Sequence, residues 1–479
     1  MKNPCLQWVG LRAAISGEVI LPGSSEYEFA RKPAIANFHG VRPQAVVRCG
    51  APEDVSEAIL FARRHGLRAA PRSGGHCFAG RSSTEGLVVD VSPMRSVSVS
   101  NGVATVGAGA RLGEVYDALD DLGLAIPAGC GPTVGIAGLA LGGGLGILGR
   151  KHGLTSDNLL RAQVVLADGL VVECDERCHE DLFWALRGSG GGNFGVVTHL
   201  DFRTLPAPDG TVFHLTWPFD RAAAVVDAWQ GWSPPGPDEL AASLLIVAPE
   251  DPAHPPVVNL FGAMLGAESK TQGLLDGMVA RVGADPASTF LDRVPYRKAK
   301  RYLAELGAEM AGEDGRIGEA PNGGPSENYS YSKSEFFRSP LPKEAIESLV
   351  ENLFQGRVAG QSRELDFTPW GGAYNRVPGA ATAFAHRDEL FLLQHTIAVG
   401  PGASAAGTEA ARRWLSRSWA SVRPWGSGRV YPNFPDPDLE GWARAYHGEN
   451  LDRLVKIKAR YDPGNFFRFR QSVTDRVPA

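Results

Sequence analysis

Two glycine-rich loops constrain this 479-residue chain more than any other feature of its sequence. The first loop reads Pro-Arg-Ser-Gly-Gly-His-Cys and ends in His76 and Cys77. The second carries Cys130 and opens a run with nine glycines between Gly129 and Gly149. Glycine has no Cβ and tolerates positive φ, so such a backbone can approach an anion or an aromatic ring closely. The loops predict a cofactor site where one ring nitrogen and one thiol could both attach to the same group.

Composition limits the classes of protein to which the chain can belong. Its length predicts two or three domains. The residues are 43% hydrophobic and 21% charged, with a net charge of −5, as in a soluble globular protein. No basic stripe suits nucleic acid, and no window reaches the ~18 apolar residues of a membrane span. The first ten residues also lack the pattern of a signal peptide. We therefore expect no nucleic-acid partner and no membrane partner.

The six cysteines predict a reducing environment. None of them forms a C-x-x-C pair, and six are too few for a disulfide scaffold in a chain of this length. We expect a cytoplasmic protein without a metal site, present as a monomer or homodimer.

Residues 40–208 alternate short predicted strands and helices. Residues 53–65 carry apolar side chains at helical spacing and end before Gly66, which predicts a helix. The segment Leu67–Pro71 is then a strand that leads into the histidine loop. In residues 162–174, Asp168 and Gly169 are typical of a two-residue hairpin turn.

After residue 209 the pattern changes to an α+β layer, predicted as an antiparallel sheet with helices behind it. Residues 311–328 are rich in Gly, Pro, Glu and Asn and predict a mobile loop. The predicted strands are Val212–Phe219, Ser243–Ala248, Val257–Met264 and Leu390–Val399, and the predicted helices are Ala222–Trp232, Thr271–Val282, Lys343–Phe354 and Ala405–Val422.

One motif within the glycine run suggests a nicotinamide-binding site, an interpretation that we reject. Residues 144–149 match G-x-G-x-x-G, and Asp168 lies near the distance expected of a ribose-binding acid. However, the residues before Gly144 do not form a clean central strand. Asp168 also sits in a predicted hairpin turn, whereas a Rossmann acid ends a strand that enters a loop or crossover.

The same glycine run fits a longer series of motifs. Residues 132–135 read P-T-V-G, residues 141–146 read L-G-G-G-L-G, and Lys151 precedes G-L-T-S-D-N at 153–158. With Arg72–His76, this series resembles the berberine-bridge-type branch of the flavin oxidases that share the vanillyl-alcohol-oxidase fold. Three further segments are similar to that family: Leu186–Val197, Tyr431–Asn433 and Tyr461–Phe466.

The resemblance covers about residues 40–205 and 390–475 and implies both fold and cofactor. It implies an α+β protein with a PCMH-type FAD-binding domain at residues 1–208, whose core is about 40–205. A substrate-binding domain with an antiparallel sheet backed by helices would occupy residues 209–427. Residues 428–479 would be the C-terminal berberine-bridge-type segment that returns to the FAD domain.

Two side chains are candidates for covalent attachment to FAD. On the resemblance, His76 bonds to the 8α-methyl group of the flavin; taken alone, it could be a turn histidine bonded to backbone. Cys130 is the second candidate, although the family's cysteine directly precedes P-T-V-G and here Gly131 stands in that place. A shift of one residue moves a side chain by ~3.5 Å unless the loop bulges. An unattached thiol is the alternative.

The resemblance also implies FAD contacts from residues along all these loops. They are Arg72, Ser73, Gly74, Gly75, Cys77, Gly129, Val134, Gly135, Gly138, Gly142, Gly143, Gly144, Gly146, Asp157, Asn158, Gly192, Asn193, Gly195, Val197 and Asn465. Valine at the position of Val134 accompanies oxygen access in similar enzymes.

The resemblance also implies the catalytic residues Tyr431, Asn433 and Gln394. Tyr431 and Asn433 alternate on a segment that we expect to be extended, so both can face one side. The family's tyrosine removes the substrate hydroxyl proton, and a phenol whose ordinary pKa is ~10 needs a cation or donated hydrogen bonds for this. Relatives often carry lysine two residues before the glutamine; this chain has Leu392. A packed tyrosine without chemistry is the alternative.

Together these features predict an FAD-linked oxidase that acts on an alcohol. Hydride would pass to covalently bound FAD, and dioxygen would reoxidise the flavin and yield hydrogen peroxide. The hydroxyl could belong to a sugar or to a natural product. Three alternatives remain: a secondary-metabolite tailoring enzyme that performs oxidative cyclisation, a dehydrogenase with another electron acceptor, and a non-catalytic binding protein of the same fold.

Overall fold

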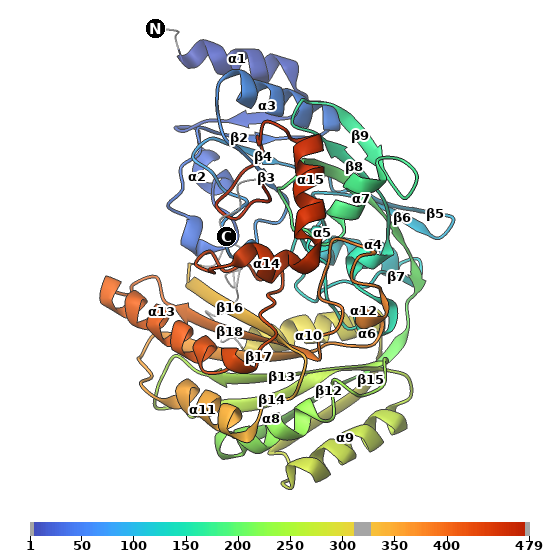
Figure 1. The fold of residues 1–479 in the computed structure, drawn as a ribbon, viewed down its shortest axis with the longest axis vertical. Helices are drawn as coiled ribbons and strands as arrows, with labels where there is room; N and C mark the ends of the chain where they lie inside the picture. Colours follow the sequence, from blue (N-terminus) through green and yellow to red (C-terminus); the bar gives the residue numbers. More distant parts are fainter. Residues whose placement is uncertain (1–3, 311–326, 475–479) are drawn as a thin grey trace.

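The computed structural model describes residues 4–310 and 327–474, which form two layered regions stacked along the long axis of the molecule (Figure 1). Two smaller sheets make the upper region. One has the order β1-β2-β4-β3, in which β2, β4 and β3 run parallel. The other is antiparallel, with the order β5-β6-β10-β8-β9. The strands are β1 (Glu18–Ile20), β2 (Ala45–Arg48), β3 (Ala69–Arg72), β4 (Leu87–Asp90), β5 (Val97–Ser100), β6 (Val103–Gly107), β8 (Leu159–Val165), β9 (Val171–Cys174) and β10 (Val196–Arg203).

Helices of the upper region pack on these two sheets around one hydrophobic core. A two-residue pair, β7 (Leu124–Ala125) with β11 (Leu205–Pro206), lies where the chain leaves this region. The helices are α1 (Pro4–Ala14), α2 (Tyr27–Ala30), α3 (Pro52–Arg64), α4 (Leu112–Asp120), α5 (Ile136–Leu141), α6 (Gly149–His152) and α7 (Glu180–Leu186).

The lower region is built on one antiparallel seven-stranded sheet with the order β15-β12-β14-β13-β17-β18-β16. This strand order places β17 directly beside β13 and β18 between β17 and β16, although β17 and β18 are distant from β12 and β13 in the sequence. The strands are β12 (Asp209–Pro218), β13 (Leu240–Ala248), β14 (Val257–Leu265), β15 (Ser288–Pro295), β16 (Tyr329–Phe337), β17 (Gln361–Pro369) and β18 (Phe391–Val399).

The two faces of this sheet have different neighbours. Four helices bury their apolar stripes on the outer face and form the second large core: α8 (Ala222–Gln230), α9 (Glu268–Val282), α11 (Lys343–Phe354) and α13 (Ala405–Ala420). The inner face is turned toward the upper region, and α10 (Tyr296–Met310) packs between them, against β12 and β15 (Figure 1). Elsewhere on this face, Phe336 and Leu392 pack with Leu154 and Tyr431, and another part of the face lines a cavity.

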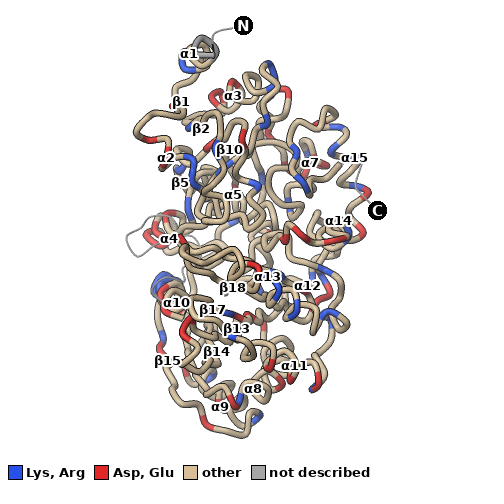
Figure 2. Tube along the Cα trace, turned by 90° about the vertical axis from the view of Figure 1, so that its left-hand side faces the viewer, with Lys and Arg blue, Asp and Glu red and all other residues tan. Residues whose placement is uncertain are grey.

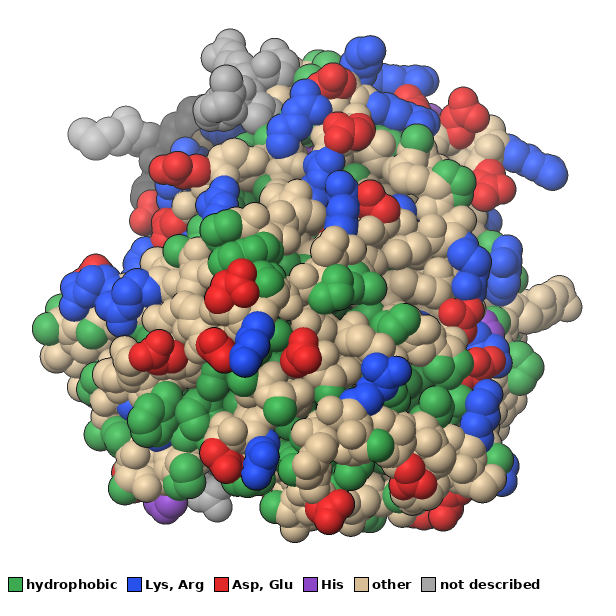
Figure 3. All heavy atoms as spheres, turned by 60° about the horizontal axis from the view of Figure 1, so that its bottom comes forward, with side chains coloured by type: hydrophobic (Ala, Val, Ile, Leu, Met, Phe, Trp, Pro, Cys, Tyr) green, Lys and Arg blue, Asp and Glu red, His purple; other side chains and the backbone are tan. Residues whose placement is uncertain are grey.

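The C-terminal part returns to the upper region. After α12 (Ala373–Arg376) and β18, the chain continues through α14 (Trp442–His447) into α15 (Leu451–Tyr461), which packs against α7. Leu454, Ile457 and Tyr461 of α15 join the large hydrophobic core of the upper region. Charges of both signs are interspersed along the chain and on the lower face of the molecule (Figures 2 and 3).

Most of the predicted elements are present. The helix predicted at 53–65 is α3, and β8 and β9 form the hairpin predicted about Asp168, with Gly169 at φ +85°. The four predicted strands and four predicted helices of the lower region are also present, whereas β15, β16, β17 and α10 were not predicted. The loop predicted at 311–328 lies, apart from residues 327 and 328, outside the described residues. The domain boundaries at 208 and 427 stay predictions.

Across residues 4–310 and 327–474, no helix has the length and apolar character to cross a membrane. Within the same ranges, no three His, Cys, Asp or Glu side chains gather as metal ligands would.

Candidate active site

The two glycine loops lie in backbone contact. The first follows β3, and the second pairs with Arg111 through a single β-bridge at Gly135. A Cβ added at Gly74 would overlap the backbone nitrogen of Gly135, and a Cβ at Gly135 would overlap that of Gly74. Only glycine allows this approach, so these two positions set the spacing between the loops.

A cavity of about 540 Å³ lies between these loops and the C-terminal segment. It is lined by residues 71–78 and 431–435 and by parts of the segments 129–145 and 191–197. The predicted residues on its wall are Arg72, Ser73, Gly74, Gly75, His76, Cys77, Gly129, Cys130, Val134, Gly135, Gly138, Gly192, Gly195, Val197, Tyr431 and Asn433. The structure therefore brings most of the predicted flavin contacts to one site.

Open space beside one glycine leaves room for a ligand against this wall. Gly138 is exposed in α5, and a Cβ built there meets no protein atom within 4 Å. Arg72, by contrast, uses its donors within the protein, because its guanidinium donates to the carbonyl oxygens of Ser82, Ala30 and Arg31. The wall is mostly backbone and small side chains, as an FAD site requires.

The other predicted FAD residues lie outside this wall and hold the loops in place. A Cβ at Gly142 would overlap the Asn433 amide, and one at Gly144 would overlap Thr155. Asp157 accepts two hydrogen bonds from the Arg387 guanidinium, at 2.7 and 2.9 Å. The residues concerned are Gly142, Gly143, Gly144, Gly146, Asp157, Asn158, Asn193 and Asn465.

Three asparagines among these residues also support backbone. The amide of Asn158 donates to the carbonyls of His152 and Leu154. Asn193 accepts from the backbone N–H of Val473 at 3.0 Å, which ties its loop to the C-terminal segment. Asn465 has φ +46° in the turn that follows α15. In the structure these residues hold the loops of the site in place, and their contact with FAD stays a prediction.

His76 is held by one hydrogen bond in this cavity. Its Nε2 lies 3.1 Å from Thr133 Oγ1. Enclosure by the loops lowers the pKa of His76 to about 4, and the charge of Arg111 acts in the same direction. The ring is therefore neutral at pH 7 and keeps a lone pair on one nitrogen.

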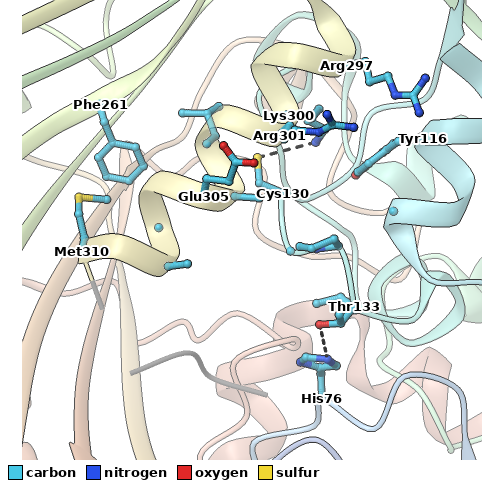
Figure 4. A pocket seen from close by; sticks show the side chains of 18 of the residues that line it. His76, Tyr116, Cys130, Thr133, Phe261, Arg297, Lys300, Arg301, Glu305 and Met310 are labelled. Carbon is cyan, nitrogen blue, oxygen red and sulfur yellow. Dashed lines mark hydrogen bonds between the residues drawn. The ribbon is translucent and has the colours of Figure 1, made fainter. Parts of the chain in front are cut away.

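The cavity of about 540 Å³ is the candidate flavin cavity. Cys130 lies where it meets a second cavity of about 690 Å³ beneath the inner face of the large sheet (Figure 4). Helix α10 forms one side of this second cavity, and β13, β14 and β17 contribute Leu245, Phe261, Glu364 and Asp366. Its position, open to the loops that line the flavin cavity, identifies it as the candidate substrate cavity.

The segment that carries Tyr431 is a turn, which corrects the extended segment expected from the sequence. The backbone N–H of Phe434 donates to the carbonyl of Tyr431 at 2.9 Å, and Pro432 and Asn433 occupy the central positions. Proline fixes φ near −65° and favours the first of these positions. Asn433 nevertheless reaches Tyr431, because its amide donates to the phenol oxygen at 3.1 Å.

Tyr431 is a buried phenol whose oxygen accepts two hydrogen bonds. The second donor is the backbone N–H of Gly144, at 2.9 Å. Burial raises the pKa of Tyr431 to about 12, against the opposing effect of the donated hydrogen bonds. The rings of Phe434, Phe384 and Trp370 surround it, and Leu392 packs in the same apolar cluster.

Gln394 lies on the inner face of the sheet and is held by a neighbouring strand. Its amide donates to Ser332 Oγ at 2.7 Å, and only 8% of the residue is exposed. In the register of β17 and β18 it stands directly opposite Asp366. His395 points the other way, toward Ser418 of α13, as alternation along a strand requires.

The sequence analysis missed two carboxylates, Glu364 and Asp366. Both line the substrate cavity, and Asp366 lines the flavin cavity as well. Burial raises the pKa of Asp366 to about 6, and burial with the charge of Asp366 raises the pKa of Glu364 to about 7. Their signal was a period-two alternation over residues 361–369, which puts Ser362, Glu364, Asp366 and Thr368 on one face.

Family models match both ends of the chain. A model described as an FAD binding domain matches residues 43–175, and one described as berberine and berberine like matches residues 430–474. These are the segments that build the glycine loops and the Tyr431 turn.

Whole-chain comparisons agree. The FAD-linked oxidoreductase YgaK of Bacillus subtilis (strain 168) is 31% identical over 96% of this chain and 98% of its own. A xylooligosaccharide oxidase from Myceliophthora thermophila C1, with xylobiose bound, has a TM-score of 0.84 at 28% identity over 98% and 100% of the two chains. A glucooligosaccharide oxidase from Acremonium strictum, described as revealing a novel flavinylation, has a TM-score of 0.86 at 26% identity over 98% and 99%.

The fold and the site therefore define an FAD-linked oxidoreductase. The chain belongs to the berberine-bridge-enzyme-like family. The family, the PCMH-type α+β fold and the FAD cofactor inferred from the sequence are confirmed.

Proposed function

We propose that this enzyme oxidises an alcohol on a sugar, with dioxygen as electron acceptor and hydrogen peroxide as product. The observation that carries the proposal is Asp366, whose carboxylate lines both the flavin cavity and the substrate cavity. The similarity to oligosaccharide oxidases over nearly the full chain supports a sugar hydroxyl.

In this proposal Asp366, rather than Tyr431, takes the hydroxyl proton. A carboxylic acid with pKa about 6 is mostly ionised at pH 7 and close to the best strength for a general base. A phenol with pKa about 12 stays protonated at that pH. Because the Tyr431 oxygen already accepts from Gly144 and Asn433, its own proton is free to be donated to the substrate oxygen.

The glycine loops would hold the FAD, which when bound accepts the hydride from the alcohol carbon. His76 would form one covalent bond to it: a tautomer whose Nε2–H donates to Thr133 leaves the Nδ1 lone pair as nucleophile. Cys130, on the wall of the same cavity, would form the second. Val134 would flank the ring, where its modest size leaves room for dioxygen.

A second candidate substrate is an aromatic or polyketide hydroxyl of secondary metabolism. Leu245, Phe261 and Leu303 line the substrate cavity and suit an apolar body better than a sugar. With such a substrate, the enzyme would perform a tailoring oxidation or cyclisation with the same proton acceptor.

We also propose a monomer or homodimer in the cytoplasm. The cysteines whose side chains the structure describes are all unpaired, which fits a reducing compartment.

Acid precipitation followed by peptide mapping tests the cofactor, and a peroxide assay tests the reaction. We expect yellow colour on a peptide that contains His76, and peroxide formed in proportion to substrate consumed with oligosaccharides. Colour released into the supernatant would contradict the covalent link. Turnover with an artificial acceptor but no peroxide would identify a dehydrogenase, and turnover of aromatic alcohols alone would favour the second candidate.

A further inference from the structure

Lys300 of α10 is a buried cation that contacts the second glycine loop. Only 3% of the residue is exposed. Its Nζ donates to the carbonyl oxygens of Ala128 and Gly129 at 2.6 and 2.7 Å, and its third contact is the sulfur of Cys130 at 3.8 Å (Figure 4). An ammonium has three N–H donors and no acceptor, and these three partners are all acceptors. The geometry thus suits the charged form of Lys300.

A buried ammonium needs a counter-charge, and the structure offers few candidates. In the described ranges, no carboxylate forms an ion pair with Lys300, and its strongest interactions besides the carbonyls are with Tyr116, Tyr296 and Cys130. Burial raises the pKa of both tyrosines well above the ordinary value of a phenol. Burial lowers the pKa of Lys300, and the contact with Cys130 opposes that effect. Among these three side chains a thiol is by nature more acidic than a phenol, so Cys130 is the contact that could balance the charge.

We propose that Lys300 is a positioning residue that holds Cys130 as a thiolate and thereby prepares it to bond to the flavin. A thiolate is the nucleophilic form of cysteine, and a neighbouring lysine stabilises it. This inference rests on the covalent attachment proposed above.

The same contacts explain how a cysteine displaced by one residue can serve. Lys300 donates to the two backbone carbonyls immediately before Cys130. The position of α10 therefore sets the direction of the Cys130 side chain. At Gly131, the usual place of the cysteine, a Cβ would lie 3.1 Å from Val134 Cγ2, which is tighter than an ordinary contact. Cys130 instead lines both cavities.

The bond requires a net two-electron oxidation, which dioxygen supplies. The sulfur–carbon bond forms at C6 of the flavin ring, and the C6–H bond breaks. The proton of the thiol, the proton from C6 and two electrons pass to dioxygen, which leaves as hydrogen peroxide. Lys300 gives up no atom in this balance; it only stabilises the thiolate before the bond forms.

Other charged groups around the second cavity are paired with other residues or lie at its edge. Arg297 pairs with Asp117 at 2.7 Å. Arg301 and Glu305 of α10 lie beside Cys130 (Figure 4), and Glu364 and Asp366 of β17 line the same cavity. None of these replaces the direct contact between Lys300 and the sulfur.

The first test maps flavin attachment in the holoenzyme. Wild type, Lys300→Met, Lys300→Arg and the control Lys298→Met, an exposed lysine of the same helix, are denatured and digested, and flavin is measured on the His76 and Cys130 peptides. We expect at least tenfold less flavin on Cys130 in Lys300→Met, with the His76 link kept, partial recovery in Lys300→Arg and no change in the control. Equal attachment in wild type and Lys300→Met overturns the proposal.

The second test uses intact Lys300 and measures pH dependence. In a His76→Ala holoenzyme, only the Cys130 bond can form, and its rate is followed from pH 5.5 to 9. A held thiolate gives a rate that stays constant down to about pH 7, whereas an ordinary thiol with pKa ~8.5 loses tenfold per pH unit below that value. The ordinary profile overturns the proposal even if Lys300→Met fails to fold.

The two proposals fail in different ways. If His76 carries flavin, peroxide forms and Cys130 carries none, then the inference about Lys300 is wrong and the proposed function stands. If all flavin is released, the covalent attachment fails at both residues, while the peroxide assay still decides the oxidase reaction.

Discussion

At the scale of single residues, two acidic groups on one cavity wall differ in their protonation state. Burial raises the pKa of both Tyr431 and Asp366, but from ordinary values of ~10 and ~3.9, to about 12 and about 6 respectively. The same physical effect therefore moves the phenol away from neutral pH and the carboxylic acid toward it. In the proposed reaction, this difference favours Asp366 as the proton acceptor and Tyr431 as the hydrogen-bond donor.

Replacing Asp366 by asparagine should remove the proton acceptor while keeping the shape of the side chain. We expect kcat/KM to fall about 10²–10³-fold. In wild type, kcat/KM should fall as pH drops through about 6, because protonated Asp366 can no longer accept; the variant should lose this limb. Initial rates from pH 5 to 9 measure both effects. Asp388→Asn, an exposed carboxylate, is the control, and an unchanged acidic limb in Asp366→Asn would exclude Asp366.

Replacing Tyr431 by phenylalanine should slow the reaction without losing FAD. The ring still fits among its aromatic neighbours, but the Asn433 amide and the Gly144 N–H lose their acceptor. Leaving such groups unpaired costs about 1–3 kcal/mol, which lowers the melting temperature. We expect a roughly tenfold to hundredfold fall in kcat with unchanged flavin content, measured by steady-state kinetics and absorbance. Tyr331→Phe, on the edge strand β16, is the matched control. A normal kcat in Tyr431→Phe would show that Tyr431 takes no part in the reaction.

At the scale of elements, the sequence predicted those parts whose pattern is local. The hairpin about Asp168 and helix α3 follow from turn and spacing rules. Strand β17 was not predicted, because a charged residue, Arg363, lies on its core-facing side. There its guanidinium donates to carbonyls at the end of α11. At Tyr431, the alternation of Tyr431 and Asn433 indicates an extended segment, whereas Pro432 and Asn433 are themselves typical of the turn that forms.

Interactions between distant elements were beyond the sequence. The role of Lys300 depends on α10 crossing to the loop at Ala128, and no local pattern shows that contact. The cofactor residues were inferred from a family resemblance, which does not separate residues that line a cavity from those that hold its loops. Asp157 illustrates this, because only the fold brings Arg387 to it.

Two glycines separate ligand contact from loop packing at this scale. A methyl group at Gly138 meets no protein atom but enters the flavin cavity, whereas one at Gly142 overlaps the Asn433 amide. We expect Gly138→Ala to keep the stability of the flavin-free chain and to reduce FAD content or the extent of attachment. Gly142→Ala should lower both. Melting temperature and flavin content distinguish them, with Gly273→Ala on α9, also in open space, as the control. Full flavin content in Gly138→Ala would contradict a flavin beside α5.

At the scale of the whole molecule, buried cations join segments that lie far apart in the sequence. Arg150 of α6 donates to the carbonyls of Ser233, Pro234 and Gly236 in the lower region. Lys300 of α10 makes the reciprocal contact with the upper loops. These contacts satisfy backbone carbonyls with charged donors, which gives strong hydrogen bonds in a fixed direction. They tie the lower region, which carries Asp366, to the upper region, which carries the glycine loops of the flavin cavity.

Lys458 makes the corresponding contact for the C-terminal segment. It is 3% exposed, pairs with Asp462 at 2.7 Å and donates to the carbonyls of Asn193 and Phe467. The Asn193 loop is part of the frame of the flavin cavity. Removal of Lys458 would leave the Asp462 carboxylate buried without its partner, although the N–H groups of Phe466 and Phe467 still donate to it.

We therefore expect Lys458→Met to destabilise the enzyme by about 3–5 kcal/mol, the usual cost of an uncompensated buried charge. Flavin content should fall with it, because the loop at Asn193 loses its tie to α15. Arg460→Met, on the same helix as Lys458, removes a surface ion pair with Asp181 of α7 and should cost at most about 1 kcal/mol. Chemical denaturation and flavin absorbance measure both variants. Equal stability of the two would show that the C-terminal segment is held by its apolar contacts with α7 and the core, and that the Lys458 pair is dispensable.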